Sequence, residues 1–339
     1  MIVVTGASGF IGSALVTRLA AAGLRVTGID RRPPAAARPA PRHVVADLAD
    51  PLAPAVRDLL AGADAVVHLA GRAGVRDRRP GVELARHRDN VLATRRVLAA
   101  ATGPVLAASS SSVYGGARDG RACREDDALR PAGGYASSKA AAENACAAAR
   151  DGGAAVCVLR PFTVVGPGQR PDMALDHWIR AALERRAVEV FGGLHRSRDV
   201  TDVRAVVTAV AQLVDQATSG ASLPDVVNLG TGRGRSIGEL LDAVRGAVGG
   251  PLDVRVTSPA ADDPDHTLAD TTRCAATLGW VPTTDLDDVV AAQLRRLICP
   301  ERPRPSGCTL CPERPGPGGS HARQPADVGG SRRNARTNA

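Results

Sequence analysis

The chain has 339 residues, of which 44% are hydrophobic and 2% aromatic, so it is long enough to bury the core of one large or two ordinary domains. Its net charge is +8, but half of the excess lies in residues 300–339, and the remainder is too small to indicate a nucleic-acid partner. There is no apolar run of the ~18 residues that a membrane span needs and no signal-peptide pattern at the start, so we expect a cytoplasmic protein.

Short apolar strands alternate with helices from the first residue onward. Residues 2–5 (IVVT) predict a buried strand, and IGSALVTRLAAAG has apolar residues at helical spacing and stops at Gly23. A further helix is predicted within residues 88–101. Further strands are predicted at residues 24–30, 43–47, 64–70, 104–110, 156–161 and 225–230. This alternation predicts an α/β fold with a Rossmann-like, doubly wound parallel sheet.

Composition divides the chain into a nucleotide-binding domain, a smaller lobe and a tail. We expect the Rossmann domain at residues 1–165 with return segments at about 199–235, and a helix-rich substrate lobe from residues 166–198 and 236–298. Residues 300–339 are rich in Pro, Gly, Arg and Ser without periodicity, which predicts disorder.

The cysteines do not indicate a metal site or a disulfide framework. They number seven and are scattered through a long chain, which is typical of reduced thiols in a cytoplasm. Cys308 and Cys311 form a CxxC pair in the tail, but no second pair stands at zinc-finger spacing. We therefore expect no metal, with a tail zinc site as the disfavoured alternative.

A glycine-rich turn predicts a dinucleotide site. TGASGFIG places Gly6, Gly9 and Gly12 between a strand and a helix, where the backbone can approach a pyrophosphate at the helix N-terminus. Asp30 ends the next strand, where a carboxylate can accept hydrogen bonds from the adenosine ribose and repel a 2′-phosphate. This favours NAD over NADP, although the neighbouring Arg31 and Arg32 are able to receive such a phosphate.

The stretch YASSK contains Lys139, the only lysine of the chain, four residues after one of its two tyrosines, Tyr135. On a helix both side chains lie on one face. A phenol has an ordinary pKa of about 10, and a nearby ammonium favours the phenolate. We therefore expect Lys139 to lower the pKa of Tyr135 and to bond the nicotinamide ribose, for which the broad guanidinium of arginine is less suited.

Together with TGASGFIG, this stretch makes the chain resemble the extended short-chain dehydrogenase/reductase family, in particular its nucleotide-sugar epimerases and dehydratases. The resemblance covers about residues 1–298 and includes HLAG at 68–71, SSSSVYGG at 109–116 and GWVP at 279–282. It implies a homodimer and a catalytic set of Ser110, Tyr135 and Lys139. The implied cofactor-binding residues are Gly6, Ser8, Gly9, Phe10, Ile11, Gly12, Asp30, Asp47, Leu48, Leu69, Ala70, Asn90, Tyr135, Lys139 and Phe162.

Three further segments are similar to UDP-glucuronate 4-epimerases: AGVR (73–76), LRPFTVVGPGQRPDMA (159–174) and RSRDVTDV (196–203). The resemblance implies that Arg170 lies near the sugar and Arg198 on the diphosphate, with Asp263 near the uridine. The implied substrate-binding residues are Arg76, Ser110, Ser111, Ser112, Tyr135, Thr163, Arg170, Arg198 and Asp263.

Ser111 and Ser112 stand where related 4,6-dehydratases carry an Asp–Glu pair and UDP-glucuronate decarboxylases carry Glu. The resulting hypothesis is an NAD-dependent 4-epimerase of a UDP-hexose, preferentially UDP-glucuronate to UDP-galacturonate. The alternatives are a UDP-glucose/UDP-galactose 4-epimerase or dual specificity and, with less support, a decarboxylase or a non-catalytic nucleotide-sugar-binding protein. Departures at DVRA (202–205), DDPD (262–265) and HLAG leave the substrate preference open.

Other polar or reactive residues are expected to be structural. His68 follows an apolar strand and predicts a packed histidine rather than an acid–base group. The same expectation covers His177, Trp178, His195, Cys123, Cys146 and Cys157.

Overall fold

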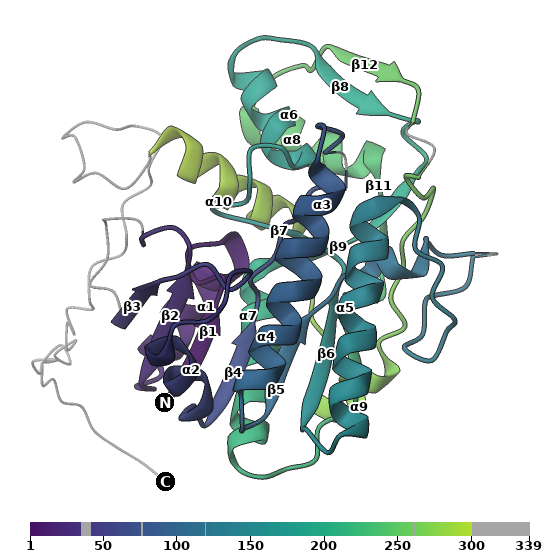
Figure 1. Cartoon of the computed structure of the whole chain (residues 1–339). Helices are drawn as coiled ribbons and strands as arrows, with labels where there is room; N and C mark the ends of the chain where they lie inside the picture. Colours follow the sequence, from purple (N-terminus) through teal and green to yellow (C-terminus); the bar gives the residue numbers. More distant parts are fainter. Residues whose placement is uncertain (35–41, 76, 119, 260–261, 300–339) are drawn as a thin grey trace, which may run out of the picture. The chain divides into compact units, whose positions relative to one another are not determined.

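The computed structural model describes residues 1–34, 42–75, 77–118, 120–259 and 262–299, and the tail predicted at 300–339 lies outside them. Its main sheet has seven parallel strands in the order β10-β6-β5-β4-β1-β2-β3 (Figure 1). The strands are β1 (Ile2–Thr5), β2 (Val26–Asp30), β3 (Arg42–Val45), β4 (Ala65–His68), β5 (Val105–Ala108), β6 (Val156–Pro161) and β10 (Val226–Leu229).

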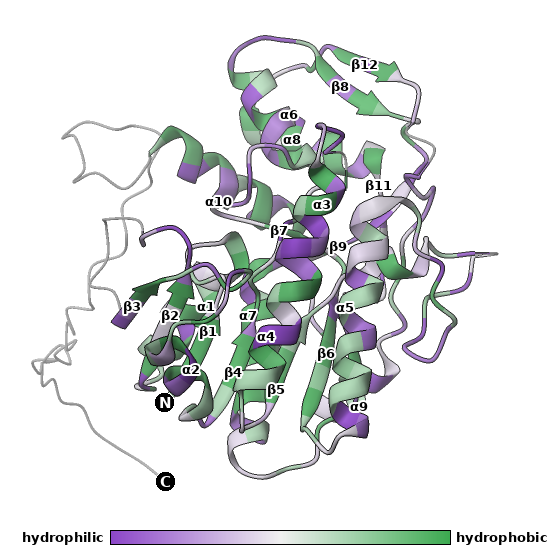
Figure 2. Cartoon of the chain, in the orientation of Figure 1, coloured by the Kyte–Doolittle hydropathy of each residue, from purple (hydrophilic) through white to green (hydrophobic). Residues whose placement is uncertain are grey.

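All seven strands coincide with segments predicted from the sequence, and the α/β, doubly wound fold class is confirmed. The central strands are apolar because helices cover both faces of the sheet, as is usual for parallel sheets. β1 and β4, for example, are buried at every residue. Figure 2 shows the central strands mainly in the colour of hydrophobic residues.

Two apolar clusters hold helices to the two faces of the sheet. One contains Leu15 and Leu19 of α1 with Val207 of α7, and the other contains Val56 of α2 with Val97 of α4. The helices of the first face are α1 (Phe10–Ala21), α7 (Val203–Thr218) and α9 (Thr272–Leu278); those of the second are α2 (Pro54–Ala61), α4 (Ala93–Ala100) and α5 (Gly133–Asp151).

The helix predicted at 88–101 begins earlier, at Val82, and part of it is π-helical rather than α-helical. It consists of α3 (Val82–Arg86), a π-helical segment η1 (His87–Leu92) and α4. π-Helical turns are rare and are frequent at functional sites. Here the segment contains Asn90, whose side chain is only 1% exposed.

A third cluster lies beyond the C-terminal ends of the strands, at the top of Figure 1, where Trp178 and Ile179 pack with Leu241 and Val289. Its helices and strands are α6 (Ala174–Leu183), α8 (Ile237–Val248), α10 (Leu286–Ile298), β8 (Val188–Phe191) and β12 (Val254–Thr257). The sheet formed by β7 (Thr163–Val165), β9 (Ser197–Asp202) and β11 (Gly234–Ser236) lies between it and the main sheet. That this cluster binds the substrate stays a prediction.

The strand order places a crevice between β1 and β4. The chain proceeds from β1 through β2 to β3 in one direction and then from β4 through β5 and β6 in the other. In doubly wound sheets, ligands bind outside the carboxyl ends of the strands at this point of reversal. The residues that follow β1 and β4 are Gly6 and Leu69.

Candidate active site

The turn from β1 into α1 is built on glycines that no other residue can replace. Gly6 has a φ of +68°, and an added Cβ would lie 2.7 Å from the backbone nitrogen of Ala70. A Cβ at Gly12 would collide with the carbonyl of Gly6. The N-terminus of α1 has no side-chain cap, so its N–H groups are available to an anion such as a pyrophosphate.

A groove beside this turn collects many of the predicted cofactor residues. It is lined, among others, by Gly6, Gly9, Asp30, Asp47, Leu48, Leu69 and Ala70. Asp30 is 8% exposed and accepts hydrogen bonds from the backbone N–H groups of Ser8 (3.0 Å) and Arg32 (2.9 Å). These bonds fix the carboxylate at the end of β2. The residues present therefore fit a dinucleotide with an unphosphorylated ribose.

Asp47, one of the predicted cofactor-binding residues, also lines this groove. Partial burial would raise the pKa of Asp47, but hydrogen bonds from the Ala49 N–H and the Arg88 guanidinium outweigh it and lower the pKa. Arg88 also contacts Asp50 at 2.9 Å. The carboxylate is thus ionised and fixed at neutral pH.

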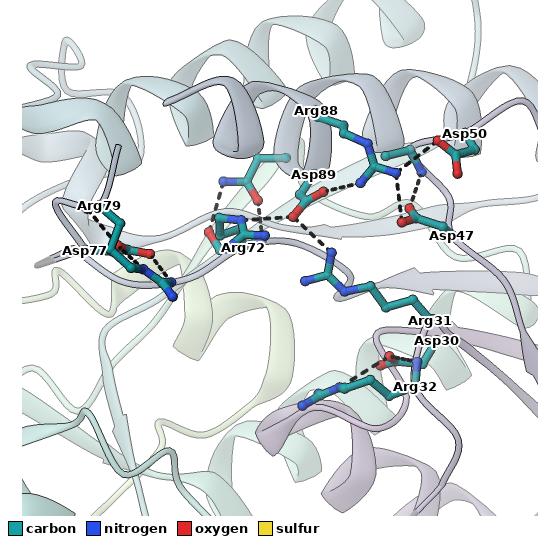
Figure 3. A network of polar contacts seen from close by, with 12 residues as sticks. Asp30, Arg31, Arg32, Asp47, Asp50, Arg72, Asp77, Arg79, Arg88 and Asp89 are labelled. Atoms are coloured by element: carbon teal, nitrogen blue, oxygen red, sulfur yellow. Dashed lines mark hydrogen bonds and ion pairs between the residues drawn. The ribbon is translucent and has the colours of Figure 1, made fainter. Parts of the chain in front are cut away.

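Arg31 crosses the groove to a carboxylate that sequence reasoning did not single out (Figure 3). Its Nη1 donates to Asp89 Oδ2 at 3.2 Å, and Arg72 Nε donates to the same oxygen at 3.0 Å. Arg32 lies 3.7 Å from Asp30. Both arginines that were able to receive a 2′-phosphate are therefore engaged with carboxylates, which supports the prediction of NAD.

Asn90 joins the loop after β4 to the helix that carries Tyr135. Its Oδ1 accepts from the Arg72 backbone N–H (2.7 Å), and its Nδ2 donates to Ser138 Oγ (2.8 Å). An added Cβ at Gly71 would lie 2.6 Å from Asn90 Oδ1 and 3.4 Å from Lys139 Nζ. The glycine in HLAG therefore leaves the space that the asparagine and the lysine occupy.

Tyr135 and Lys139 lie one turn apart on α5, as predicted from their spacing. The Ser110 hydroxyl lies near the Tyr135 phenol and acts to lower its pKa, and Ser110 Oγ accepts from Ser112 Oγ (2.9 Å). Lys139 is 7% exposed and donates to the carbonyl of Ala108 at 2.8 Å. The three predicted catalytic side chains thus meet at the carboxyl end of β5.

Burial shifts the pKa of both members of this pair. Burial raises the pKa of Tyr135, against the Ser110 hydrogen bond and the charges of Arg170 and Arg86, which lower it. The Lys139 ammonium, one turn further along α5, is directed to the carbonyl of Ala108. Burial lowers the pKa of Lys139 itself to about 8. That Lys139 activates the phenol stays a prediction.

His68 is a structural residue, as expected. Its ring nitrogens contact the hydroxyls of Thr5 (2.7 Å) and Thr94 (3.0 Å). Burial, with the charge of Lys139, lowers the pKa of His68 to about 3, so the imidazole is neutral at physiological pH. It joins β1 to α4 beneath the site.

The predicted substrate residues fall into separate groups. Arg198 Nη2 donates to Asp263 Oδ1 at 2.8 Å, so the residues assigned to the diphosphate and the uridine contact each other. Arg170 is bound at two atoms by Asp172, at 2.8 and 2.9 Å. Thr163 begins β7 and pairs with Val200 of β9.

The remaining assignments are placed as follows. Ser111 and Ser112 begin the short helix η2 (Ser111–Tyr114). Phe162 is 2% exposed and stacks on Tyr114 with ring centroids 6.2 Å apart. Arg76 lies outside the described residues.

Two absences concern the described part of the chain. Its histidine, cysteine and carboxylate side chains form no group of three or more that could hold a metal ion. Within the same residues, no helix has the length and apolar character required to cross a bilayer.

The sequence analysis did not identify Arg72, Asp89 and Ser138. Asp89 contacts Arg31, and Arg72 and Ser138 hydrogen-bond Asn90. No spacing rule marks them, because their partners come from other elements of the fold. The only signal was HLAG itself, whose glycine marks a close approach of side chains.

Comparison with known proteins supports the prediction of an NAD-binding enzyme. The sequence profile described as "NAD dependent epimerase/dehydratase family" matches residues 2–230. The UDP-glucose 4-epimerase of Mycolicibacterium smegmatis is 32% identical in an alignment 312 residues long, which covers 85% of this chain and 95% of that protein. MoeE5, solved with UDP-glucuronic acid and NAD, superposes with a TM-score of 0.78 at 36% identity, covering 88% of this chain and 99% of that one.

A third similar protein is the UDP-glucuronic acid 4-epimerase of Bacillus cereus, solved with UDP-glucuronic acid and NAD. It has a TM-score of 0.81 at 26% identity and covers 88% of this chain and 99% of its own. MoeE5 has also been solved with UDP-glucose and NAD.

Proposed function

The chain belongs to the NAD-dependent epimerase/dehydratase family, and from that membership we propose that it is a 4-epimerase that converts UDP-glucuronate to UDP-galacturonate. The observation that carries the proposal is the convergence of Ser110, Tyr135 and Lys139 at the carboxyl end of β5, with Ser111 and Ser112 following in η2. Elimination of water from a 4-keto sugar needs an acid and a base at C5 and C6. The sequence of η2, SSVY, contains no carboxylate for that role.

The proposed reaction begins with proton transfer at the 4-hydroxyl of the sugar. Tyr135, in its ionised form, accepts that proton directly or through the Ser110 hydroxyl. NAD, held by the residues around the glycine-rich turn, would supply the hydride acceptor and donor for C4, so that no net oxidation remains. Tyr135 then gives the proton back to the 4-oxygen.

The chain's own residues would hold the cofactor and the substrate during these steps. Asp30 would accept bonds from the adenosine ribose, and the N-terminus of α1 would face the pyrophosphate. Lys139 would bond the nicotinamide ribose. Arg198 and Asp263 would anchor the UDP while the 4-keto sugar rotates, so that the hydride can return to its opposite face.

A UDP-glucuronate epimerase must also protect its 4-keto intermediate from decarboxylation. A ketone at C4 beside a carboxylate at C5 is prone to lose CO₂, so the carboxylate has to be held in an unreactive orientation. Ser111, Ser112 and the backbone near Thr163 are the groups that we assign to this task.

Arg170 is the residue that we expect to distinguish an acidic sugar from a neutral one. Its charge acts on the Tyr135 phenol, which supports a position close to the sugar. Arg170→Ala should lower kcat/KM for UDP-glucuronate by about 10- to 100-fold and affect UDP-glucose less, since a hydrogen bond to a charged group is lost only with the first substrate. Steady-state kinetics on both UDP-sugars measure this difference.

Arg186→Ala is the matched control. Arg186 is likewise an exposed arginine paired with a carboxylate two residues away, Glu184, at 2.6 Å. It should leave both activities unchanged. If Arg170→Ala lowered kcat/KM equally for both UDP-sugars, the assigned role would be contradicted.

The second candidate is a UDP-glucose/UDP-galactose 4-epimerase or an enzyme of dual specificity. The complex of MoeE5 with UDP-glucose and the relative from M. smegmatis support it. A higher kcat/KM for UDP-glucose than for UDP-glucuronate in the wild type would favour this candidate. Tyr135→Phe should reduce turnover of either sugar by about 100- to 10,000-fold, and unchanged turnover would point to a different chemistry.

A further inference from the structure

Three arginines contact one buried carboxylate beside the dinucleotide groove. Asp89 is 6% exposed. It accepts hydrogen bonds from Arg31 Nη1 (3.2 Å), Arg72 Nε (3.0 Å) and Arg88 Nη1 (2.9 Å). Asp89 lines the groove together with Arg31 and Asp30. It therefore belongs to the cofactor site, although neither the glycine-rich turn nor Asp30 requires a carboxylate there.

Asp89 is the fixed member of its contact with Arg31. Arg72 binds its Oδ2 and Arg88 binds its Oδ1, so the carboxylate is held at both oxygens without Arg31. Arg31, by contrast, is 46% exposed and reaches Asp89 from the end of β2. A partly exposed arginine has many rotamers available to it. The position of the Arg31 guanidinium therefore depends on Asp89.

Arg31 stands where an arginine can distinguish NADP from NAD. It directly follows Asp30, the carboxylate that fits an unphosphorylated adenosine ribose. An arginine near this position accommodates the 2′-phosphate of NADP in other dinucleotide-binding folds, because its planar fork binds phosphate at two atoms. Figure 3 shows the Arg31 side chain extending from the end of β2 toward Asp89, whereas Arg32 turns to Asp30. Arg31 is thus directed away from the ribose carboxylate.

Among the described residues, Asp89 is the carboxylate to which the Arg31 side chain hydrogen-bonds. Asp47 lines the same groove, but its Oδ2 accepts a hydrogen bond from Arg88 at 2.9 Å. It is therefore already engaged and does not replace Asp89. Loss of the Asp89 charge would free the Arg31 guanidinium to contact a ligand in the groove.

We propose that Asp89 is a specificity-determining residue for the cofactor. By holding Arg31, it removes the cation that would neutralise a 2′-phosphate, and so it adds to the repulsion by Asp30 in favour of NAD over NADP. Asp89 acts on the cofactor through Arg31, as a positioning residue. The inference goes beyond the proposed function, because it concerns the dinucleotide and does not depend on which UDP-sugar the protein converts.

Competition between dinucleotides measures this preference without turnover. The full chain is loaded with NADH, and NADP or NAD is added until the fluorescence of the bound NADH is lost. The two midpoints give the affinity for NADP relative to that for NAD. Asp30→Ser is the starting variant, because it removes the repulsion by Asp30 and leaves the contribution of Asp89 to be measured by itself.

The affinity for NADP relative to NAD should be about 10-fold higher in Asp30→Ser/Asp89→Asn than in Asp30→Ser, since the freed guanidinium adds a charge-assisted hydrogen bond to the phosphate. Addition of Arg31→Gln should remove this gain. Asp50→Asn in the Asp30→Ser background is the matched control. Asp50 also pairs with Arg88, at 2.9 Å, but it is 64% exposed and, within the described residues, forms no ion pair with Arg31. The relative affinity should not change in this control.

Equal relative affinities in Asp30→Ser and Asp30→Ser/Asp89→Asn would overturn the proposal, including the case in which both dinucleotides bind more weakly to the same extent. A gain that persists after Arg31→Gln would also overturn it, because the gain would then reflect the loss of negative charge alone.

If Asp89→Asn does not fold, Arg72→Gln is compared with Arg72→Gln/Asp89→Asn in the Asp30→Ser background, since the second variant removes one cation together with one anion. It should show the same gain in relative affinity for NADP, and the absence of a gain would overturn the proposal. Failure to convert any UDP-sugar would contradict the proposed function and leave this result standing.

Discussion

Lys139 is the single lysine of the chain, and the structure explains why arginine does not replace it. Its ammonium fits between the Ala108 carbonyl, at 2.8 Å, and the bare backbone of Gly71. A guanidinium is larger and planar, and it cannot contact one carbonyl in the same space. The size of the cation therefore matters at this position, besides its charge.

Lys139→Arg should consequently lower kcat by about 100-fold, although the positive charge is retained. Turnover of UDP-glucuronate measures the effect, and circular dichroism checks that the variant folds. Turnover close to that of the wild type would show that charge alone is sufficient at this position.

The identity of the reacting side chains was predictable, but the electrostatics around them were not. TGASGFIG and YASSK are local patterns whose spacing fixes which side chains meet. The groups that act on the Tyr135 phenol, Arg86 and Arg170, come from segments far apart in sequence. A sequence shows that such arginines exist, whereas only the fold shows which of them act on the phenol.

Helix α5 is tied to β6 by a buried ion pair. Arg160 donates to Glu143 through Nε (2.9 Å) and Nη2 (2.6 Å), and its Nη1 donates to the Tyr114 hydroxyl (2.8 Å). The two paired side chains are 4% and 9% exposed. This pair therefore links the helix that carries Tyr135 to the sheet.

Glu143→Gln should destabilise the protein by about 3–5 kcal/mol, because it leaves the Arg160 charge buried without a counter-charge. Urea unfolding gives the free energy of unfolding. Glu184→Gln, which removes one partner of an exposed pair with Arg186, should cost less than about 1 kcal/mol. If both variants lost a similar free energy of unfolding, the buried pair would not stabilise the protein more than the exposed pair does.

The elements themselves were largely predictable, since apolar runs of four to six residues separated by helices leave few alternatives to a parallel sheet. The exception is the helix before α4. The sequence pattern predicts regular winding at 88–101, whereas the structure has π-helical winding over His87–Leu92. That winding brings Asn90 to Ser138 and the backbone of Arg72, so the irregularity follows from tertiary contacts that no local propensity encodes.

The chain as a whole combines one sheet with a separate apolar cluster beyond its carboxyl edge, and the candidate site lies on that edge. The sheet and its point of reversal follow from strand order, so the place of the dinucleotide groove could be deduced before the structure was known. The substrate side could not be deduced in the same way. Arg198 and Asp263 are 65 residues apart, and their contact depends on the packing of β9 against the segment before α9.

The central claim is that the protein inverts C4 of UDP-glucuronate by removing and returning one hydride. The most direct test is incubation of the NAD-loaded protein with UDP-glucuronate in deuterium oxide, followed by proton NMR of the products. The predicted product is UDP-galacturonate that retains hydrogen rather than deuterium at C4, because the hydride never exchanges with solvent, and at C5, because the C5–H bond is not broken. A UDP-pentose released with CO₂, deuterium at C4 or C5, or unchanged UDP-glucuronate would contradict the claim.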